Sequence, residues 1–159
     1  MNLSFQLNDK PWQLDCEPAD TLAEVLRNTL NLNGTKVSCE VQVCGACTVL
    51  IDGAPVSACT YLAYEARDKN VTTIEGLEKP DGTLHPLQQA FIDEFAFQCG
   101  YCTPGMIMSA KALLDENPQP TRNEIIHHMD GNICRCTGYM PIVAAIQRAA
   151  EVMSKESKK

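Results

Sequence analysis

The sequence predicts an α+β protein with a strand-rich first half and a helical second half. Two observations divide the chain: short alternating apolar segments fill residues 1–78, and apolar residues at helical spacing fill residues 79–159. A third is the presence of nine cysteines in 159 residues. We place the domain boundary at the linker EKPDGT, because its Pro, Gly and charged residues interrupt both patterns.

The first half contains turn and cap signals that define its elements. Asp52-Gly53 is a strong hairpin signal, and Thr21 with Glu24 forms a capping box at the start of a helix. The expected elements are strands at 3–7 and 12–16, a helix at 21–32, a hairpin at 47–59 and a strand at 70–74.

The second half contains four amphipathic segments. Pro104 and Pro141 lie where a first helical turn tolerates proline, and Thr121 with Glu124 forms a second capping box. The expected helices lie at 85–95, 104–117, 121–131 and 141–155.

Charge and composition limit the partners, the location and the kind of chemistry that we expect of this protein. The net charge of −7 disfavours nucleic acid and anionic membranes, which attract Lys and Arg clusters. Neither a secretory signal nor an apolar run of membrane-spanning length is visible, so we expect a cytoplasmic protein without membrane insertion. In a reducing compartment, so many cysteines point to metal binding or redox catalysis.

Four cysteines of the first half have the spacing of a plant-type 2Fe–2S site. Cys39, Cys44 and Cys47 follow C-x4-C-x2-C, and Cys59 follows at the far end of the predicted hairpin. Gly45 and Ala46 keep the loop small, so backbone N–H groups can approach the sulfurs. The ninth cysteine, Cys16, ends a strand and is expected to be a small buried side chain.

The second half contains another four cysteines, Cys99, Cys102, Cys134 and Cys136. Each pair is expected to open a helix, so that two helix N-termini with free N–H groups face one anionic site. This favours an iron–sulfur cluster, although a zinc ion would accept the same thiolates. A thioredoxin-like pair at Cys99 and Cys102 would leave Cys134 and Cys136 unexplained.

Four segments, CEVQVCGACTVLIDG, TTIEGL, QCGYCTPGM and GNICRCTGYMPIVAAI, resemble the iron–sulfur subunit of the molybdenum hydroxylases, the xanthine oxidase family. The resemblance covers residues 3 to 150. It implies a plant-ferredoxin-like β-grasp domain followed by a four-helix bundle, each holding one 2Fe–2S cluster. It also implies a large subunit with molybdopterin in its cytosine dinucleotide form, a medium subunit with FAD, and a dimer of heterotrimers.

The resemblance assigns two further roles. Gln98 matches a glutamine whose amide bonds the molybdopterin of the partner, and Cys136 matches a ligand that also lies against the pterin. Electrons would run from molybdenum through the helical-domain cluster and the ferredoxin-like cluster to FAD, with no substrate site on this chain. A free-standing two-cluster ferredoxin and a zinc-binding interaction module remain as alternatives. Ser38 and Gln42 stand where the family has glycine, so Gln42 should strain the loop or take a modified turn.

Overall fold

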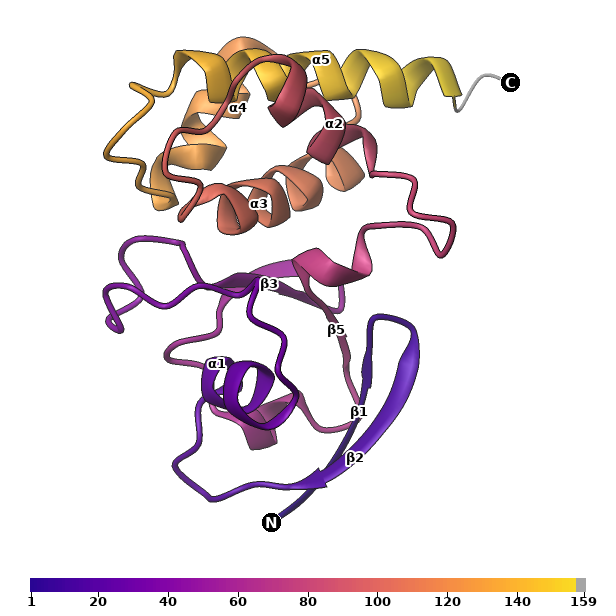
Figure 1. Cartoon of the computed structure of the whole chain (residues 1–159), viewed down its shortest axis with the longest axis vertical. Coiled ribbons are helices and arrows are strands. Elements are labelled where there is room, and N and C mark those ends of the chain that lie inside the picture. Colours follow the sequence, from indigo (N-terminus) through magenta and orange to yellow (C-terminus); the bar gives the residue numbers. More distant parts are fainter. Residues whose placement is uncertain (157–159) are drawn as a thin grey trace.

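The computed structural model describes residues 1–156 as two stacked parts, a sheet with its covering helix and a group of longer helices (Figure 1). The strands are β1 Asn2–Leu7, β2 Lys10–Asp15, β3 Thr48–Ile51, β4 Ala54–Ser57 and β5 Asn70–Thr72. The α-helices are α1 Leu22–Glu24, α2 Pro86–Asp93, α3 Thr103–Glu116, α4 Arg122–His128 and α5 Met140–Glu156. Shorter helical turns are η1 Val25–Thr29, η2 Ala63–Ala66, η3 Ile74–Gly76 and η4 Met129–Gly131.

The strands form one mixed sheet in the order β2-β1-β5-β3-β4. β1 pairs with β2 antiparallel and with β5 parallel, whereas β3 pairs antiparallel with β4 and β5. Both hairpin turns have left-handed residues, at Asn8 and Asp9 and at Asp52 and Gly53, as tight hairpins require. The predicted strands are therefore confirmed, and the α+β class with them.

Helix α1 covers the sheet and continues as the π-helical turn η1. The Thr21 hydroxyl accepts the Glu24 N–H, and the Glu24 carboxylate accepts the Thr21 N–H, so the predicted capping box is present. Leu22 and Leu26 are fully buried with Leu3 and Val49 of the sheet. Cys16 lies in this core, 4 % exposed, as predicted.

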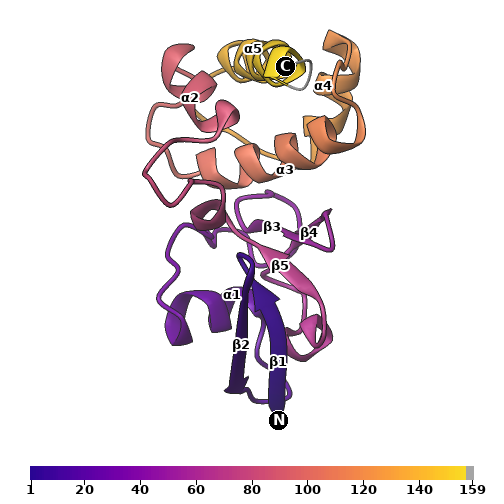
Figure 2. The ribbon, with the colours of Figure 1, turned by 90° about the vertical axis from the view of Figure 1, so that its right-hand side faces the viewer.

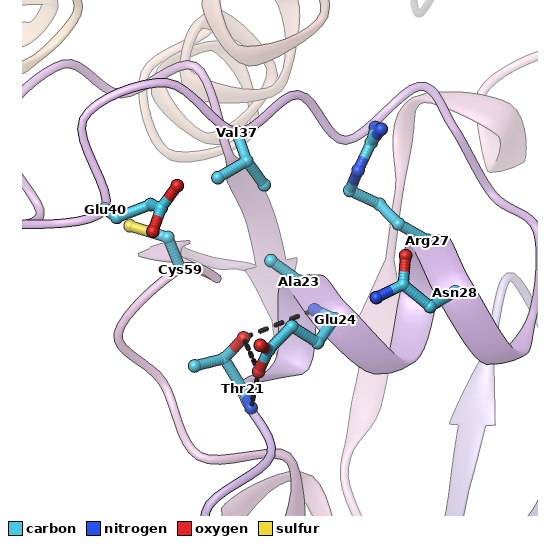
Figure 3. A pocket seen from close by; sticks show the side chains of 8 residues that line it. All are labelled: Thr21, Ala23, Glu24, Arg27, Asn28, Val37, Glu40 and Cys59. Atoms are coloured by element: carbon cyan, nitrogen blue, oxygen red, sulfur yellow. Dashed lines mark hydrogen bonds between the residues drawn. The ribbon is translucent and has the colours of Figure 1, made fainter.

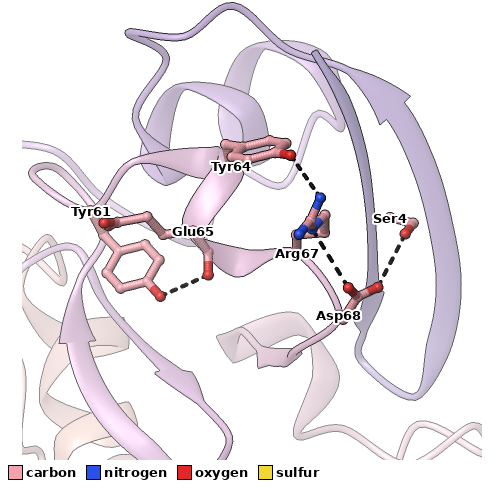
Figure 4. Close-up of polar contacts among 6 residues, drawn as sticks. All are labelled: Ser4, Tyr61, Tyr64, Glu65, Arg67 and Asp68. Carbon is pink, nitrogen blue, oxygen red and sulfur yellow. Dashed lines mark hydrogen bonds and ion pairs between the residues drawn. The ribbon is translucent and has the colours of Figure 1, made fainter.

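Polar contacts fasten the turn before β5 to β1 (Figure 4). Arg67 donates to the Tyr64 hydroxyl at 2.7 Å, and its guanidinium lies 3.6 Å from the Asp68 carboxylate. Asp68 in turn accepts the Ser4 hydroxyl of β1 at 3.5 Å. Backbone bonds add to this, since the Asp68 N–H donates to the Ser4 carbonyl at 2.8 Å.

The helices share a second core, and all four predicted helical segments are helical. Phe91, Met106, Ile125 and Ile146 bring side chains from α2, α3, α4 and α5 into it. Leu50 of β3 joins the same core, and Figure 2 shows α3 lying along this end of the sheet. The sheet and the helices therefore pack directly against each other, which positions the cysteine-bearing loops of both.

Candidate metal centres

The first four cysteines lie together on two segments. Cys39, Cys44 and Cys47 come from the loop between η1 and β3, and Cys59 follows β4. The thiols of Cys39 and Cys44 interact, as do those of Cys47 and Cys59, and Cys44 lies close to Cys47. Spacing had predicted this set, and we call it the ferredoxin-type quartet.

Backbone amides and burial act on this quartet in opposite directions. Loop N–H groups, those of Val41, Val43 and Cys44, lower the pKa of the Cys39 thiol to about 6. The Val43 nitrogen lies 3.4 Å from the Cys39 sulfur. Burial raises the pKa of Cys47 to about 12, so its thiolate needs a nearby cation, which a ligated metal would supply.

Gln42 adopts a left-handed backbone in this loop, with φ of 60°. The expected strain at the usual glycine position is therefore present, and Glu40 shows a similar φ of 57°. The Gln42 side chain accepts the Thr60 hydroxyl at 3.2 Å. Because Thr60 follows Cys59, this bond fastens the three-cysteine loop to the segment that carries the fourth.

A pocket opens beside the ferredoxin-type quartet (Figure 3). Cys59 and Glu40 line one side of it, and α1 with η1 line the other. Val41 and Val43 on the same loop are 65 % and 58 % exposed. This edge of the quartet therefore faces outward.

The second four cysteines, which we call the helical-domain quartet, lie on the loops before α3 and α5. The sulfurs of Cys99 and Cys136 are 3.7 Å apart, and the thiols of Cys102 and Cys134 interact. Cys99 and Cys136 are exposed, whereas Cys134 is buried. Spacing predicted this set too, and the structure brings both pairs together.

The expected pair of helix starts is right for one pair of cysteines and wrong for the other. Cys102 immediately precedes α3. Cys136 precedes α5 by a loop, because Gly138 and Tyr139 take left-handed φ angles of 68° and 69°. Thr137 in that loop contacts Cys134, its hydroxyl 3.2 Å and its nitrogen 3.5 Å from the sulfur.

The environments of Cys102 and Cys134 differ. Burial raises the pKa of Cys102 to about 12. Burial is also the largest effect on Cys134 and would raise its pKa, but hydrogen bonds outweigh it and the pKa is lowered. Those bonds come from the Thr137 hydroxyl, the N–H groups of Cys136 and Thr137, and the Cys102 thiol.

Three hydrogen bonds join the loops of the two quartets. The Ile133 N–H, next to Cys134, donates to the Cys44 carbonyl at 2.9 Å. The Asn132 amide donates to the Gly45 carbonyl at 3.1 Å. The Tyr101 hydroxyl donates to the Val37 carbonyl. Of these three bonds, the first gives the most direct path between two ligand residues, because Cys44 bonds Ile133 and Ile133 is the neighbour of Cys134 in the chain.

Gln98 lies beside the exposed edge of the helical-domain quartet. Its side-chain amide donates to the Cys136 carbonyl at 2.9 Å, so it joins the two cysteine loops. Sequence reasoning assigned it only a contact with a partner and missed this role. Phe95, 80 % exposed, and the exposed Phe97 and Tyr101 flank Gln98 and Cys99 in the sequence and add apolar surface.

The donor set fits a two-iron cluster at each quartet. The interacting pairs of thiols suit two irons better than one tetrahedral zinc ion. The buried Thr103 hydroxyl, beside Cys102, has no hydrogen-bond partner in the described part of the chain. A sulfur-rich group at the quartet would offer it an acceptor.

Comparison with known proteins agrees with this chemistry. A model described as a 2Fe-2S iron-sulfur cluster binding domain matches residues 5–73, and one described as a [2Fe-2S] binding domain matches residues 73–147. The nicotinate dehydrogenase small FeS subunit of Eubacterium barkeri is 46 % identical over 151 residues, 95 % of this chain and 96 % of the relative.

Two further relatives point the same way. The aldehyde oxidoreductase iron-sulfur-binding subunit of Escherichia coli is 45 % identical, covering 94 % of this chain and 72 % of that relative. The crystal structure of quinoline 2-oxidoreductase from Pseudomonas putida 86 superposes with a TM-score of 0.93 at 44 % identity, covering 98 % of this chain and 96 % of that one.

The fold and the cysteine sites thus define the class of this protein, an iron–sulfur component of an oxidoreductase. The chain belongs to the family of 2Fe–2S small subunits of the molybdenum hydroxylases. Among residues 1–156, no helix has the length and apolar character needed to cross a membrane.

Proposed function

We propose that this chain is the electron-transfer subunit of a multi-subunit molybdenum hydroxylase, carrying electrons from a molybdopterin centre to FAD through two 2Fe–2S clusters. The ferredoxin-type quartet would hold one cluster, in a β-grasp domain at 1–78. The helical-domain quartet would hold the other, in a four-helix bundle at 79–159. When bound, each cluster supplies a one-electron carrier.

The observation that carries the proposal is one of the three hydrogen bonds between the ligand loops. Cys44 and Cys134 belong to different quartets, and the Cys44 carbonyl accepts the N–H of the residue next to Cys134 at 2.9 Å. The packing of α3 against the sheet holds these loops together. A short connection of this kind between two ligand loops suits electron transfer from one site to the other.

The two exposed edges suit two partner subunits. Gln98, Cys99 and Cys136 lie at one edge, among exposed aromatic residues, and we assign this edge to the large molybdopterin-binding subunit. Gln98 and Cys136 would contact the pterin there. Val41 and Val43 lie at the other edge, beside the pocket at Cys59, and we assign this edge to the FAD-binding medium subunit.

Family membership supports several finer proposals. We propose a dimer of heterotrimers, with molybdopterin cytosine dinucleotide in the large subunit, and a cytoplasmic location, where the free cysteines stay reduced. The substrate would be an N-heteroaromatic compound or an aldehyde, bound by the large subunit. This is supported by the names of the relatives, which include a nicotinate dehydrogenase and an aldehyde oxidoreductase.

Purification of the native complex tests the proposal. We expect this chain to co-purify with one partner that holds molybdopterin and another that holds flavin, with about four irons and four sulfides per chain, two of each per cluster. A chain that purifies alone with both clusters would be a free-standing ferredoxin. Zinc in place of iron at the helical-domain quartet would identify an interaction module.

A further inference from the structure

Thr137 is the one side-chain hydroxyl that contacts a predicted ligand sulfur in residues 1–156. Its Oγ1 lies 3.2 Å from the Cys134 sulfur, and its backbone nitrogen lies 3.5 Å from the same atom. The residue is partly buried, and Cys134 is 8 % exposed, so bulk water competes little for this sulfur.

Tyr139 contacts the same hydroxyl without using its proton. The Tyr139 N–H donates to the Thr137 hydroxyl oxygen at 3.2 Å, so the oxygen acts as acceptor on that side. The only hydroxyl proton is then left for the Cys134 sulfur. Tyr139 also accepts the Cys134 N–H on its own hydroxyl at 2.9 Å, which completes a ring of three hydrogen bonds.

The left-handed backbone of this loop builds the ring. Gly138 and Tyr139 have φ angles of 68° and 69°, and this reversal brings the Tyr139 N–H back onto Thr137. A non-glycine residue in this region carries a conformational cost, which the surrounding contacts must offset. The loop therefore points the Thr137 hydroxyl at one particular sulfur.

We propose that Thr137 is a positioning residue that raises the reduction potential of the helical-domain cluster through Cys134. This inference rests on the proposed function. An electron that enters the site adds negative charge to the sulfur ligands, and a hydrogen bond to a ligand sulfur becomes stronger as that charge grows. Hydrogen bonds to cluster sulfurs are among the determinants of potential.

Cys134 is a consequential ligand for this effect. It is the residue after Ile133, whose N–H bonds the Cys44 carbonyl of the other quartet. The Thr137 hydroxyl therefore acts on the ligand at the connection between the two sites.

A redox titration of the purified complex, followed by electron paramagnetic resonance, tests the proposal with two variants. Thr137→Val keeps the side-chain shape and removes the hydroxyl, and Thr137→Ser keeps the hydroxyl. We expect Thr137→Val to lower the equilibrium constant for reduction of the helical-domain cluster about tenfold, which is about 59 mV for one electron. Thr137→Ser should titrate close to wild type, and the ferredoxin-type cluster should be unchanged in both.

Equal potentials in wild type and Thr137→Val would overturn the inference, as would an equal drop in Thr137→Ser. If Thr137→Val fails to assemble its cluster, Thr137→Ala serves as the second apolar variant with the same expected shift. These results also distinguish a failure of this inference from a failure of the proposed function. Two normal signals with unmoved potentials overturn only the role of Thr137, whereas a wild-type complex without two iron–sulfur signals overturns the function itself.

Discussion

Gly105 is the position where a single methyl group should disturb the junction between the two halves of the chain. It lies in the first turns of α3, against the loop that carries Cys44 and Cys47. A Cβ at Gly105 would meet the Gly45 carbonyl oxygen at 2.1 Å, about 1 Å closer than real Cβ atoms approach other atoms. The Ala46 backbone also lies within 3.1 Å, so the clash is with backbone and no side chain can rotate away.

The cost of Gly105→Ala follows from that geometry. Overpacking costs about 1–3 kcal/mol, and a rigid backbone neighbour places this case at the upper end, about 3 kcal/mol. For a chain of this size, a loss of that order lowers the unfolding temperature by about 6–12 °C. The helix can also yield by moving away from the loop, which would loosen the packing between the two halves of the chain.

Thermal unfolding followed by circular dichroism measures the effect, with Gly131→Ala as the matched control. A Cβ at Gly131 meets nothing within 4 Å, and its φ is not left-handed, so this variant should unfold close to wild type. Equal unfolding temperatures for Gly105→Ala and Gly131→Ala would refute the close approach of α3 to the cysteine loop.

Three further predictions concern single side chains. Gln98→Ala removes one exposed hydrogen bond, which costs about 1 kcal/mol, so both clusters should remain while their reduction by substrate becomes slower. Loss of the visible absorbance of a cluster would contradict this. Gln42→Ala and Gln42→Gly both lose the bond to Thr60, but only alanine keeps the left-handed strain of about 1 kcal/mol. The visible absorbance of Gln42→Ala should therefore disappear faster on heating than that of Gln42→Gly, and the reverse order would contradict the strain. Burial, aided by the charge of Lys111, lowers the pKa of His85, whose Nδ1 accepts the first-turn N–H of α2. The contribution of neutral His85 to stability is therefore complete above pH 6.5 and falls as the pH drops toward the folded-state pKa. The unfolding temperature of His85→Asn should depend less on pH below pH 6.5 than that of the wild type, and an unchanged pH dependence would contradict this.

Local patterns predicted the ligand groups and the elements that carry them. The spacing from Cys39 to Cys47 lies within one loop, and the Asp52-Gly53 hairpin returns the chain to bring Cys59 beside it. Gln42 was expected to strain the loop or to take a modified turn, because it replaces glycine in the family pattern, and its φ of 60° shows the strained left-handed backbone.

Contacts between distant segments could not be predicted from local sequence patterns. Cys136 was expected to open a helix, but a loop separates it from α5, because helical periodicity does not report the left-handed angles at Gly138 and Tyr139. The sequence has Cys-Thr at both 102–103 and 136–137, and which threonine contacts a sulfur depends on that loop geometry. The close approach of Gly105 to the first cysteine loop depends on how the two halves pack.

The most direct measurement of the central claim is a redox titration of the native complex by electron paramagnetic resonance, combined with iron and sulfide analysis. Two distinct one-electron signals, with about four irons and four sulfides per chain, are the expected result. The Cys44→Ser and Cys134→Ser variants should each disturb a different signal. A single signal, or zinc at the helical-domain quartet, would contradict a two-cluster electron-transfer subunit.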